Sequence, residues 1–201
     1  MIRFSDVTAG YGEKRPLTGL SLSLPDSGTV AVFGPSGCGK TTFLRLLLHA
    51  DDRKAGKGVP RVYAGRILGL EGKRFATVFQ EDRLLLWRTA RENVSLVNPS
   101  GDAGRILRSL GLAEDALCAY PAALSGGMQR RVSIARALNY PGDILLLDEP
   151  FKGLDIDTRA LVADRIRGAF PLTILVTHDP AEASLLNASL RLQLTGSQAM
   201  V

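Results

Sequence analysis

The feature that most constrains the fold of this chain is a glycine-rich loop between a short β-rich run and an apolar, helix-like run. Residues 34–41 read Gly-Pro-Ser-Gly-Cys-Gly-Lys-Thr and match the pattern G-x-x-x-x-G-K-[ST] at every defined position. The run before the loop spans residues 29–33, and the run after it spans residues 42–48. A strand, a glycine loop and a helix in this order predict a site that binds phosphate groups.

The chemistry of phosphate binding explains the residue types in this loop. Glycines let successive backbone N–H groups approach phosphate oxygens without clashes from Cβ atoms, and the start of the following helix adds a positive dipole. Lys40 is placed to reach the β- and γ-phosphates of a nucleotide, and the Thr41 hydroxyl to coordinate Mg²⁺. A glycine turn with an incidental lysine would not require the flanking strand and helix. The residues expected to bind nucleotide here are Gly34, Pro35, Ser36, Gly37, Cys38, Gly39, Lys40, Thr41 and Thr42.

A second motif, which is acidic, lies in the C-terminal half of the chain. The apolar residues 144–147 lead directly into Asp148 and Glu149. Such a run predicts a buried parallel strand that delivers both carboxylates to the edge of the sheet where ligands bind. We expect Asp148 to contact Mg²⁺ and Glu149 to act as the general base or to position the attacking water. The alternative is that these acids merely end a strand before Pro150.

Apolar runs of strand length alternate with helix-like segments along the chain, which predicts an α/β fold with a parallel sheet. Strands are expected at residues 1–7, 20–24, 29–33, 59–64, 75–79, 144–147, 172–176 and 190–194. Helices are expected at residues 42–48, 126–137, 157–169 and 180–187, with helix-like spacing across residues 88–118.

Composition limits the compartment and the partners. The chain has 201 residues, of which 45% are hydrophobic and 22% charged, as expected for one globular domain. Its two cysteines, Cys38 and Cys118, form no spaced framework, which favours a reducing cytoplasm. No apolar run reaches the roughly 18 residues of a membrane span, so we expect another chain to cross any membrane involved. The net charge of +5 is scattered without long runs, which makes nucleic acid an unfavoured partner.

A third motif identifies a family. Residues 124–129 read Leu-Ser-Gly-Gly-Met-Gln and lie between the glycine loop and Asp148. This order of motifs resembles the ATP-binding cassette (ABC) ATPases, and the resemblance covers nearly the whole chain. It implies a P-loop NTPase with a RecA-like parallel-sheet core, an N-terminal antiparallel β-subdomain and a helical insert. On that basis residues 1–201 form one domain, with residues 1–80 and 125–201 in the core and residues 81–124 in the insert.

The resemblance also implies roles for residues outside the glycine loop and the acidic pair Asp148 and Glu149. Gln80 is similar to the glutamine that touches Mg²⁺ and links the ATP site to the helical insert, and His178 to the switch histidine that contacts the γ-phosphate. Asp155 resembles the aspartate that communicates across the dimer, and Tyr11 the aromatic residue that stacks on adenine. The expected catalytic residues are then Lys40, Gln80, Glu149 and His178, and the expected metal ligands are Thr41, Gln80 and Asp148.

In this family two ATP–Mg²⁺ molecules are held between two subunits arranged head to tail. Ser125, Gly126 and Gly127 would accordingly contact the γ-phosphate that the opposite subunit binds. The implied partners are a second ATP-binding subunit, expected to be a second copy of this chain, integral-membrane permease subunits and, indirectly, a substrate-binding protein. The implied location is peripheral, on the cytoplasmic face of the inner or plasma membrane.

Residues 79–87, together with the glycine loop, resemble the ATPase subunits of bacterial nitrate, sulfonate and taurine importers. This implies import of a small solute, and residues 83–94 would face the coupling helix of a membrane subunit. Leu86 differs from that branch, which often has proline there. The alternatives are an ABC exporter component, a soluble ABC ATPase that acts on nucleic acid or ribosomes, and a small-molecule P-loop kinase.

Three further features concern less typical parts of the chain. Lys152 occupies a position where small residues are usual, so we expect an altered dimer contact. Residues 51–72 lack the familiar Pro-Thr-Ser-Gly-Glu-type turn, so the local β-subdomain is expected to be unusual. The arginines in residues 126–137 are interpreted as a solvated helix face.

Overall fold

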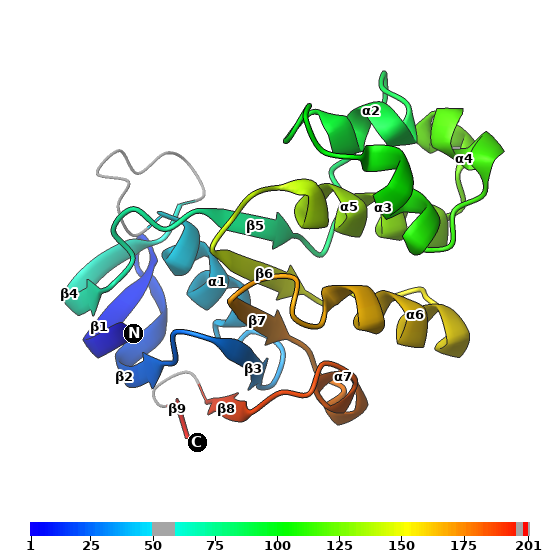
Figure 1. Ribbon diagram of the computed structural model, residues 1–201. Helices are drawn as coiled ribbons and strands as arrows, with labels where there is room; N and C mark the ends of the chain where they lie inside the picture. The colour runs from blue at the N-terminus through cyan, green and yellow to red at the C-terminus, as the bar shows by residue number, and fades with distance from the viewer. Residues whose placement is uncertain (50–58, 196–198, 201) are drawn as a thin grey trace.

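The computed structural model describes residues 1–49, 59–195 and 199–200 (Figure 1). The strands are β1 (Ile2–Tyr11), β2 (Lys14–Leu24), β3 (Gly28–Phe33), β4 (Arg61–Leu68), β5 (Phe75–Val78), β6 (Ile144–Asp148), β7 (Leu172–Val176), β8 (Leu190–Leu194) and β9 (Ala199–Met200). The helices are α1 (Lys40–His49), α2 (Ala90–Ser95), α3 (Ala103–Ser109), α4 (Glu114–Cys118), α5 (Gly126–Asn139), α6 (Ile156–Ile166) and α7 (Pro180–Leu185), with a 3₁₀ turn at Pro121–Ala123.

The main sheet has the strand order β5-β6-β7-β3-β8-β9. Neighbouring strands from β5 to β8 run parallel, and β9 is antiparallel to β8. Every residue of β6 and β7 is buried, which explains why both strands are nearly continuous apolar runs rather than alternating ones. Asp148 pairs with Val176 at the end of this register, so the segments that follow β6 and β7 emerge side by side.

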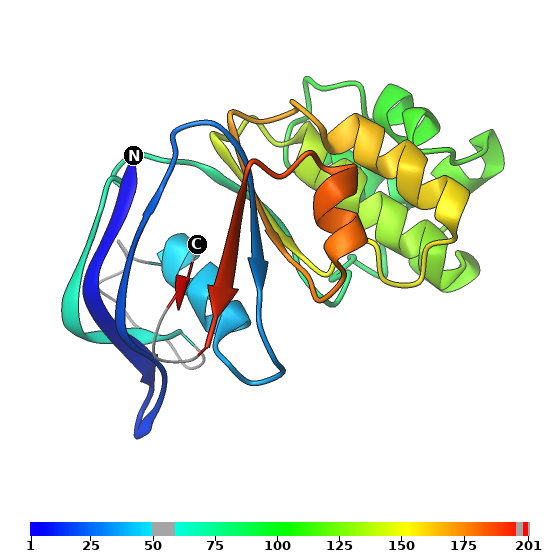
Figure 2. The ribbon, with the colours of Figure 1, turned by 90° about the horizontal axis from the view of Figure 1, so that it is seen from below.

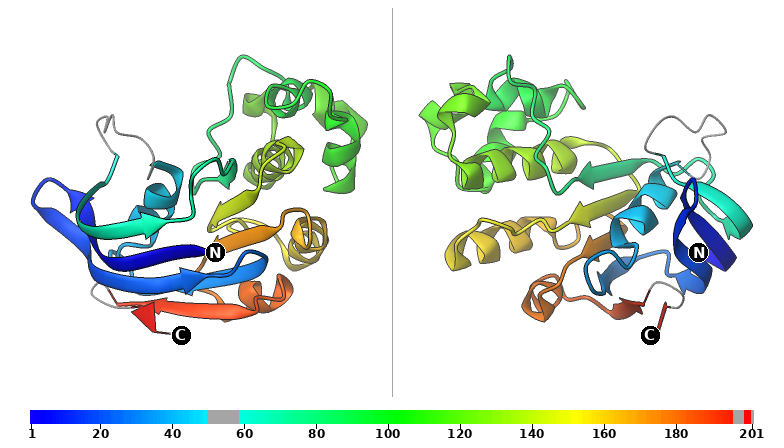
Figure 3. Two further views of the ribbon diagram at one scale, coloured as in Figure 1. Left: turned by 60° about the vertical axis from the view of Figure 1, so that its left-hand side comes forward. Right: turned by 180° about the vertical axis from the view of Figure 1, so that it is seen from behind.

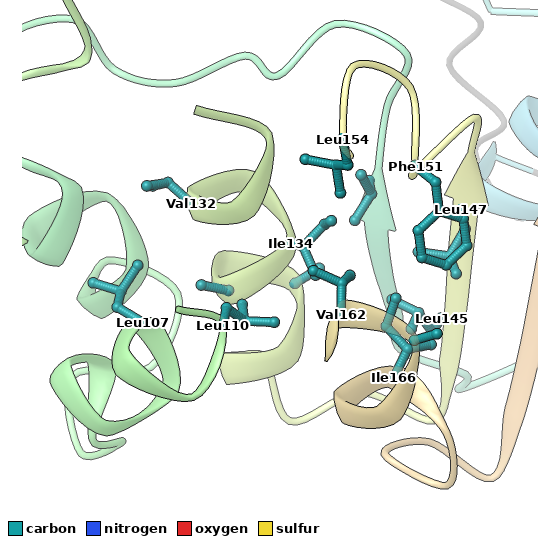
Figure 4. Close-up of a cluster of buried hydrophobic side chains, with 14 of the residues drawn as sticks. Leu107, Leu110, Val132, Ile134, Leu145, Leu147, Phe151, Leu154, Val162 and Ile166 are labelled. Carbon is teal, nitrogen blue, oxygen red and sulfur yellow. The ribbon is translucent and has the colours of Figure 1, made fainter. Parts of the chain in front are cut away.

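The main sheet is covered on both faces. Figure 2 shows four layers: the antiparallel sheet, α1, the main sheet, and a layer that contains α5, α6 and α7. Because side chains alternate along a strand, Ile144 and Leu146 of β6 face the α1 side, whereas Leu145 and Leu147 pack with α5 and α6. Figure 4 shows this second cluster, in which Val162 and Ile166 lie near Leu145.

The second sheet has the order β2-β1-β4 and is antiparallel throughout. Its inner face packs against α1, where the rings of Phe4 and Phe43 have centroids 5.3 Å apart. This contact seats the helix that follows the glycine loop between two sheets. The arrangement confirms the expected P-loop fold with a parallel-sheet core, an antiparallel β-sheet and helices.

The remaining helices form a separate group. α2, α3 and α4 pack with α5, and both views of Figure 3 place this group and the antiparallel sheet at opposite ends of the molecule. The helix-like segment predicted at residues 88–118 is three short helices. Thr89 and Glu92 form a capping box at the start of α2, Asp102 caps α3, and Gly111 at φ 76° follows the end of α3. These local signals divide a segment that periodicity alone describes as continuous.

Some predicted boundaries differ from the structure. The first strand continues past residue 7 to Tyr11, because register shifts in β1 keep it paired with β2 and β4. The strand predicted at residues 59–64 is β4, which ends at Leu68, and residues 51–58 of the unusual segment lie outside the described residues. The helix predicted to end at residue 169 ends at Ile166, shortly before Gly168 at φ 71°. Across the parts of the chain that the structure describes, every helix is too short or too polar to span a bilayer.

The packing of α1 gives a stability prediction. Phe43→Ala should lower the free energy of unfolding by about 3–5 kcal/mol, because it removes a fully buried ring and leaves a cavity between the two sheets. Urea unfolding followed by circular dichroism measures the change. Tyr120→Ala, which removes a half-exposed ring, is the matched control and should change the free energy by about 0.5 kcal/mol or less. Equal losses in the two variants would contradict this account of α1.

Candidate active site

The glycine loop connects the end of β3 to the start of α1 and depends on glycine at two positions. A Cβ atom on Gly34 would lie 2.5 Å from both the Cys38 Sγ and the Leu194 carbonyl oxygen. Gly39 has φ 104°, and a Cβ atom there would lie 2.8 Å from Leu17. The close turn that brings the loop back to α1 is therefore available only to glycine at these two positions.

A cavity of about 300 Å³ lies against this loop. Its wall combines the glycine loop with residues at the ends of β5 and β6, from distant parts of the sequence. Pro16 of β2 completes the wall. The lining residues are Pro16, Ser36, Gly37, Gly39, Lys40, Thr41, Thr42, Gln80, Asp148 and Glu149. The sheet register thus brings together the residues predicted for phosphate, metal and water.

Lys40 and Thr41 both lie at the start of α1, but they contact different partners. The Lys40 ammonium donates to the carbonyl oxygens of Gly34 at 2.7 Å and Pro35 at 3.0 Å. Thr41 lines the cavity together with Asp148, which is 7% exposed. Burial and then the charge of Glu149 raise the pKa of Asp148 above its ordinary value, although Thr41 opposes the shift. A hydroxyl and a carboxylate side by side are hard oxygen ligands of the kind that Mg²⁺ prefers.

Glu149 follows β6 in a left-handed backbone conformation with φ 51°, which is uncommon for a residue with a side chain. Its N–H donates to the carbonyl oxygen of Val176 at 3.0 Å. Its Oε2 lies 2.8 Å from the Nδ1 atom of His178, which follows β7. The hydrogen bond to Glu149, and then the charge of that carboxylate, raise the pKa of His178 above its ordinary value. The pair is thus assembled across two neighbouring strands, beside the wall of the cavity.

The predicted binding residues outside the glycine loop lie elsewhere, beginning with Ser125, Gly126, Gly127 and Asp155. Ser125 caps α5 by accepting a hydrogen bond from the Met128 N–H at 3.3 Å, and Gly126 and Gly127 open that helix. Asp155 caps α6 and accepts from the Thr158 N–H at 2.9 Å and its hydroxyl at 2.7 Å. None of these residues lines the cavity beside Lys40.

Tyr11 and Lys152 occupy positions that the sequence indicated only roughly. Tyr11 is the last residue of β1 rather than a residue after it, and its hydroxyl accepts a hydrogen bond from Arg45 of α1 at 3.3 Å. Lys152 lines a second hollow with Glu149, Gly153 and His178. The unusual lysine therefore lies beside the proposed catalytic pair.

Comparison with known proteins points to the same family as the sequence motifs. Residues 17–152 match the model of a family described as ABC transporter. The aliphatic sulfonates import ATP-binding protein SsuB 2 of Nocardia farcinica is 40% identical over 194 residues, which are 92% of this chain and 77% of that protein. The protein of the same description from Pseudomonas savastanoi pv. phaseolicola is 41% identical over 193 residues, 92% of this chain and 68% of the relative.

The chain belongs to the ABC transporter family. It is an ATP-binding and ATP-hydrolysing subunit, as its motif order predicts. The fold agrees with two solved structures. One is a dimeric bacterial ABC transporter cassette, with a TM-score of 0.82 at 25% identity. The match covers 100% of this chain and 97% of the cassette. A bacterial Atm1-family ABC exporter with ATP bound has a TM-score of 0.81 at 24% identity, with 100% and 38% covered.

The interpretation of the α5 arginines as a solvated face is wrong for Arg130. Its side chain is buried, with 3% of the residue exposed, and donates to the carbonyl oxygens of Phe79, Gln80 and Glu149. The last two residues line the cavity beside Lys40. Ile134 and Ala137 lie one and two helical turns further along and are also buried. This spacing was the available signal, because it places Arg130 on the inward face of α5.

The contacts of Glu182 and Arg159 were not predicted either. Glu182 in α7 is 4% exposed and accepts a hydrogen bond from the Thr177 hydroxyl, directly before His178. Burial raises the pKa of Glu182 above its ordinary value. Arg159 of α6 lies 3.8 Å from Glu182 and donates to the carbonyl oxygen of Leu154 at 3.0 Å. These contacts link the segment before Asp155 to the segment that carries His178.

The geometry of Glu149 gives a catalytic prediction. Glu149→Gln should lower the ATPase kcat by at least about 100-fold, because an amide cannot accept the proton of an attacking water. Mg-ATP binding, measured by isothermal titration, should remain close to wild type. Glu71→Gln replaces an exposed glutamate away from the cavity and should retain wild-type turnover. Wild-type turnover in Glu149→Gln would refute the assignment of the base.

Proposed function

We propose that this chain works as a head-to-tail pair that closes on two Mg-ATP molecules and drives import through membrane subunits. The proposal is carried by the observation that only some of the residues expected to contact ATP lie at one cavity within a single copy of the chain. Lys40 and Glu149 lie on the wall of one cavity, whereas the ABC signature at Ser125–Gly127 does not. A second copy that contributes its signature would complete the set.

The signature has the physical properties that this arrangement needs. Gly126 and Gly127 stand at the N-terminus of a 14-residue helix, where free N–H groups and the helix dipole favour an anion. A Cβ atom on Gly127 would lie 3.5 Å from the Gly153 carbonyl oxygen, so the signature and the loop before Asp155 are neighbours. Ser125 and Asp155 would then approach the partner's nucleotide together.

Mg²⁺ fits the oxygen atoms on the cavity wall. We assign Thr41, Asp148 and Gln80 as the residues that would hold it, directly or through water. In the ranges the structure covers, no group of three or more His, Cys, Asp or Glu side chains is placed to hold a metal, which suits an ion that keeps phosphate and water ligands. When bound, the ion supplies positive charge to the phosphate oxygens during transfer.

The chain's own residues would then perform three tasks. Lys40 would exchange its loop carbonyls for phosphate oxygens, which make stronger, charge-assisted hydrogen bonds. Glu149 would accept the proton of the attacking water, and His178, from the segment after β7, would orient that carboxylate. Tyr11, which α1 holds through Arg45, would present its ring to adenine.

Import and its cargo are proposed from relatives. Proteins 37–42% identical to this chain are described as aliphatic sulfonates import ATP-binding proteins. We therefore propose aliphatic sulfonates as the first solutes to test. The remaining alternatives are an exporter subunit and a soluble ABC ATPase. The fold alone does not separate them, since the exporter noted above shares it.

The membrane contact is proposed at the segment that follows Gln80. Leu86 and Trp87 are large apolar residues with exposed fractions of 68% and 71%. They lie shortly before α2, the first helix of the helical group. Both would be buried by the coupling helix of a permease, which would hold the chain on the cytoplasmic face of the membrane. A substrate-binding protein would associate through the permease rather than with this chain.

A pull-down from source-cell membranes tests this proposal. Tagged Glu149→Gln in Mg-ATP should recover a second copy of the chain and a multi-span membrane protein, because slowed hydrolysis keeps the pair closed. Adding Leu86→Ser and Trp87→Ser should lose the membrane protein and keep the second copy. Recovery of only soluble, ribosomal or nucleic-acid partners would refute the importer proposal and leave the ATPase assignment intact.

A further inference from the structure

We propose that Arg130 is a positioning residue for ATP hydrolysis, which holds the segment carrying Gln80 and the backbone of Glu149 in one fixed arrangement. The guanidinium donates to four oxygens. Nη1 donates to the Phe79 carbonyl oxygen at 2.6 Å and to Asp82 Oδ1 at 3.0 Å. Nη2 donates to the carbonyl oxygens of Gln80 at 3.1 Å and Glu149 at 3.0 Å. The inference rests on the proposed catalytic role of Glu149.

Burial makes this set of bonds necessary. A cation removed from water is costly unless it is paired and hydrogen-bonded, and a broken set leaves an uncompensated charge. The Asp82 carboxylate supplies the opposite charge, while three carbonyl oxygens accept the other bonds of the two Nη groups. Lysine carries the same charge but lacks the planar fork, so it cannot reproduce all four bonds at once.

The bonds also act where position matters. The N–H of Glu149 is held by Val176 and its carbonyl by Arg130, so its uncommon backbone conformation is fixed on both sides. The same guanidinium holds the residue before Gln80 and Gln80 itself. A change in this contact would move the base and the glutamine together.

Arg130 further joins these two segments to the signature helix. It lies on the second turn of α5, whose first residues are Gly126 and Gly127. Arg136 of the same helix donates to the carbonyl oxygens of Asp82 at 2.9 Å and Arg83 at 2.8 Å. A displacement of α5 when the signature meets a partner's nucleotide would therefore reach Gln80 and Glu149 through direct bonds.

Steady-state kinetics of Arg130→Lys test the inference. We expect kcat to fall by about 10- to 100-fold, as misplacing catalytic groups does, with the KM for ATP and the Tm close to wild type. The matched control is Arg131→Lys on the same helix, where the arginine donates to carbonyls of the helical group, Leu110 at 3.1 Å and Gly111 at 2.8 Å. The control should keep wild-type kcat. Unchanged kcat in Arg130→Lys, or a parallel loss of Tm and ATP affinity, would overturn the proposal.

Two further variants keep the outcome interpretable. In a Glu149→Gln background, Arg130→Lys should cause no further loss, because a residue that acts through Glu149 has nothing left to position. Full activity of Glu149→Gln alone would refute the assignment of the base, whereas an inactive Glu149→Gln with fully active Arg130→Lys would refute only this inference. If Arg130→Lys does not fold, Arg130→Gln gives the same test, because it removes the buried cation and leaves the more exposed Asp82 carboxylate. A lower kcat with unchanged KM would support the proposal, and wild-type kcat would overturn it.

Discussion

Parallel pairing of β3, β6 and β7 is the constraint on which the site depends. Asp148 and Val176 share a register position, and Val32 of β3 is paired with Val176 on the other side of β7. The glycine loop follows β3, Asp148 ends β6 with Glu149 next to it, and His178 lies two residues after β7. The residues proposed to bind phosphate, to hold Mg²⁺ and to activate water are thereby brought to one edge of the sheet by backbone hydrogen bonds, before any side chain contributes.

Much of this arrangement could be predicted because burial and chemistry pointed the same way. The nearly continuous apolar runs of β6 and β7 favour fully buried strands, and the glycine loop at residues 34–41 has the residue types that phosphate binding requires. The ends of α2, α3 and α6 were harder to predict, because caps and left-handed glycines determine them. Arg130 was missed because a charge is ordinarily solvated, so its spacing with the buried residues Ile134 and Ala137 was not weighed. Its partners Phe79, Asp82 and Glu149 lie far away in the sequence and are known only from the structure.

α5 is the element that unites the two halves of the structure. It packs against α2 and α3 on one side and against β5 on another, and its N-terminus carries the ABC signature. The predicted boundary at residue 125 assigns it to the core, and its contacts join that core to the helical group. Because one of its arginines bonds to the backbone of Gln80 and Glu149, α5 would link assembly of the proposed pair to the position of the proposed catalytic groups.

The central claim is that the edge formed by β3, β6 and β7 is where ATP binds, and titration of Mg-ATP tests it most directly. Lys40→Ala should weaken binding by about tenfold or more, since it removes a charge-assisted contact to phosphate. Lys73→Ala, which removes an exposed lysine away from the cavity, should bind like the wild type. Equal affinities for all three proteins would contradict the placement of the nucleotide on the glycine loop.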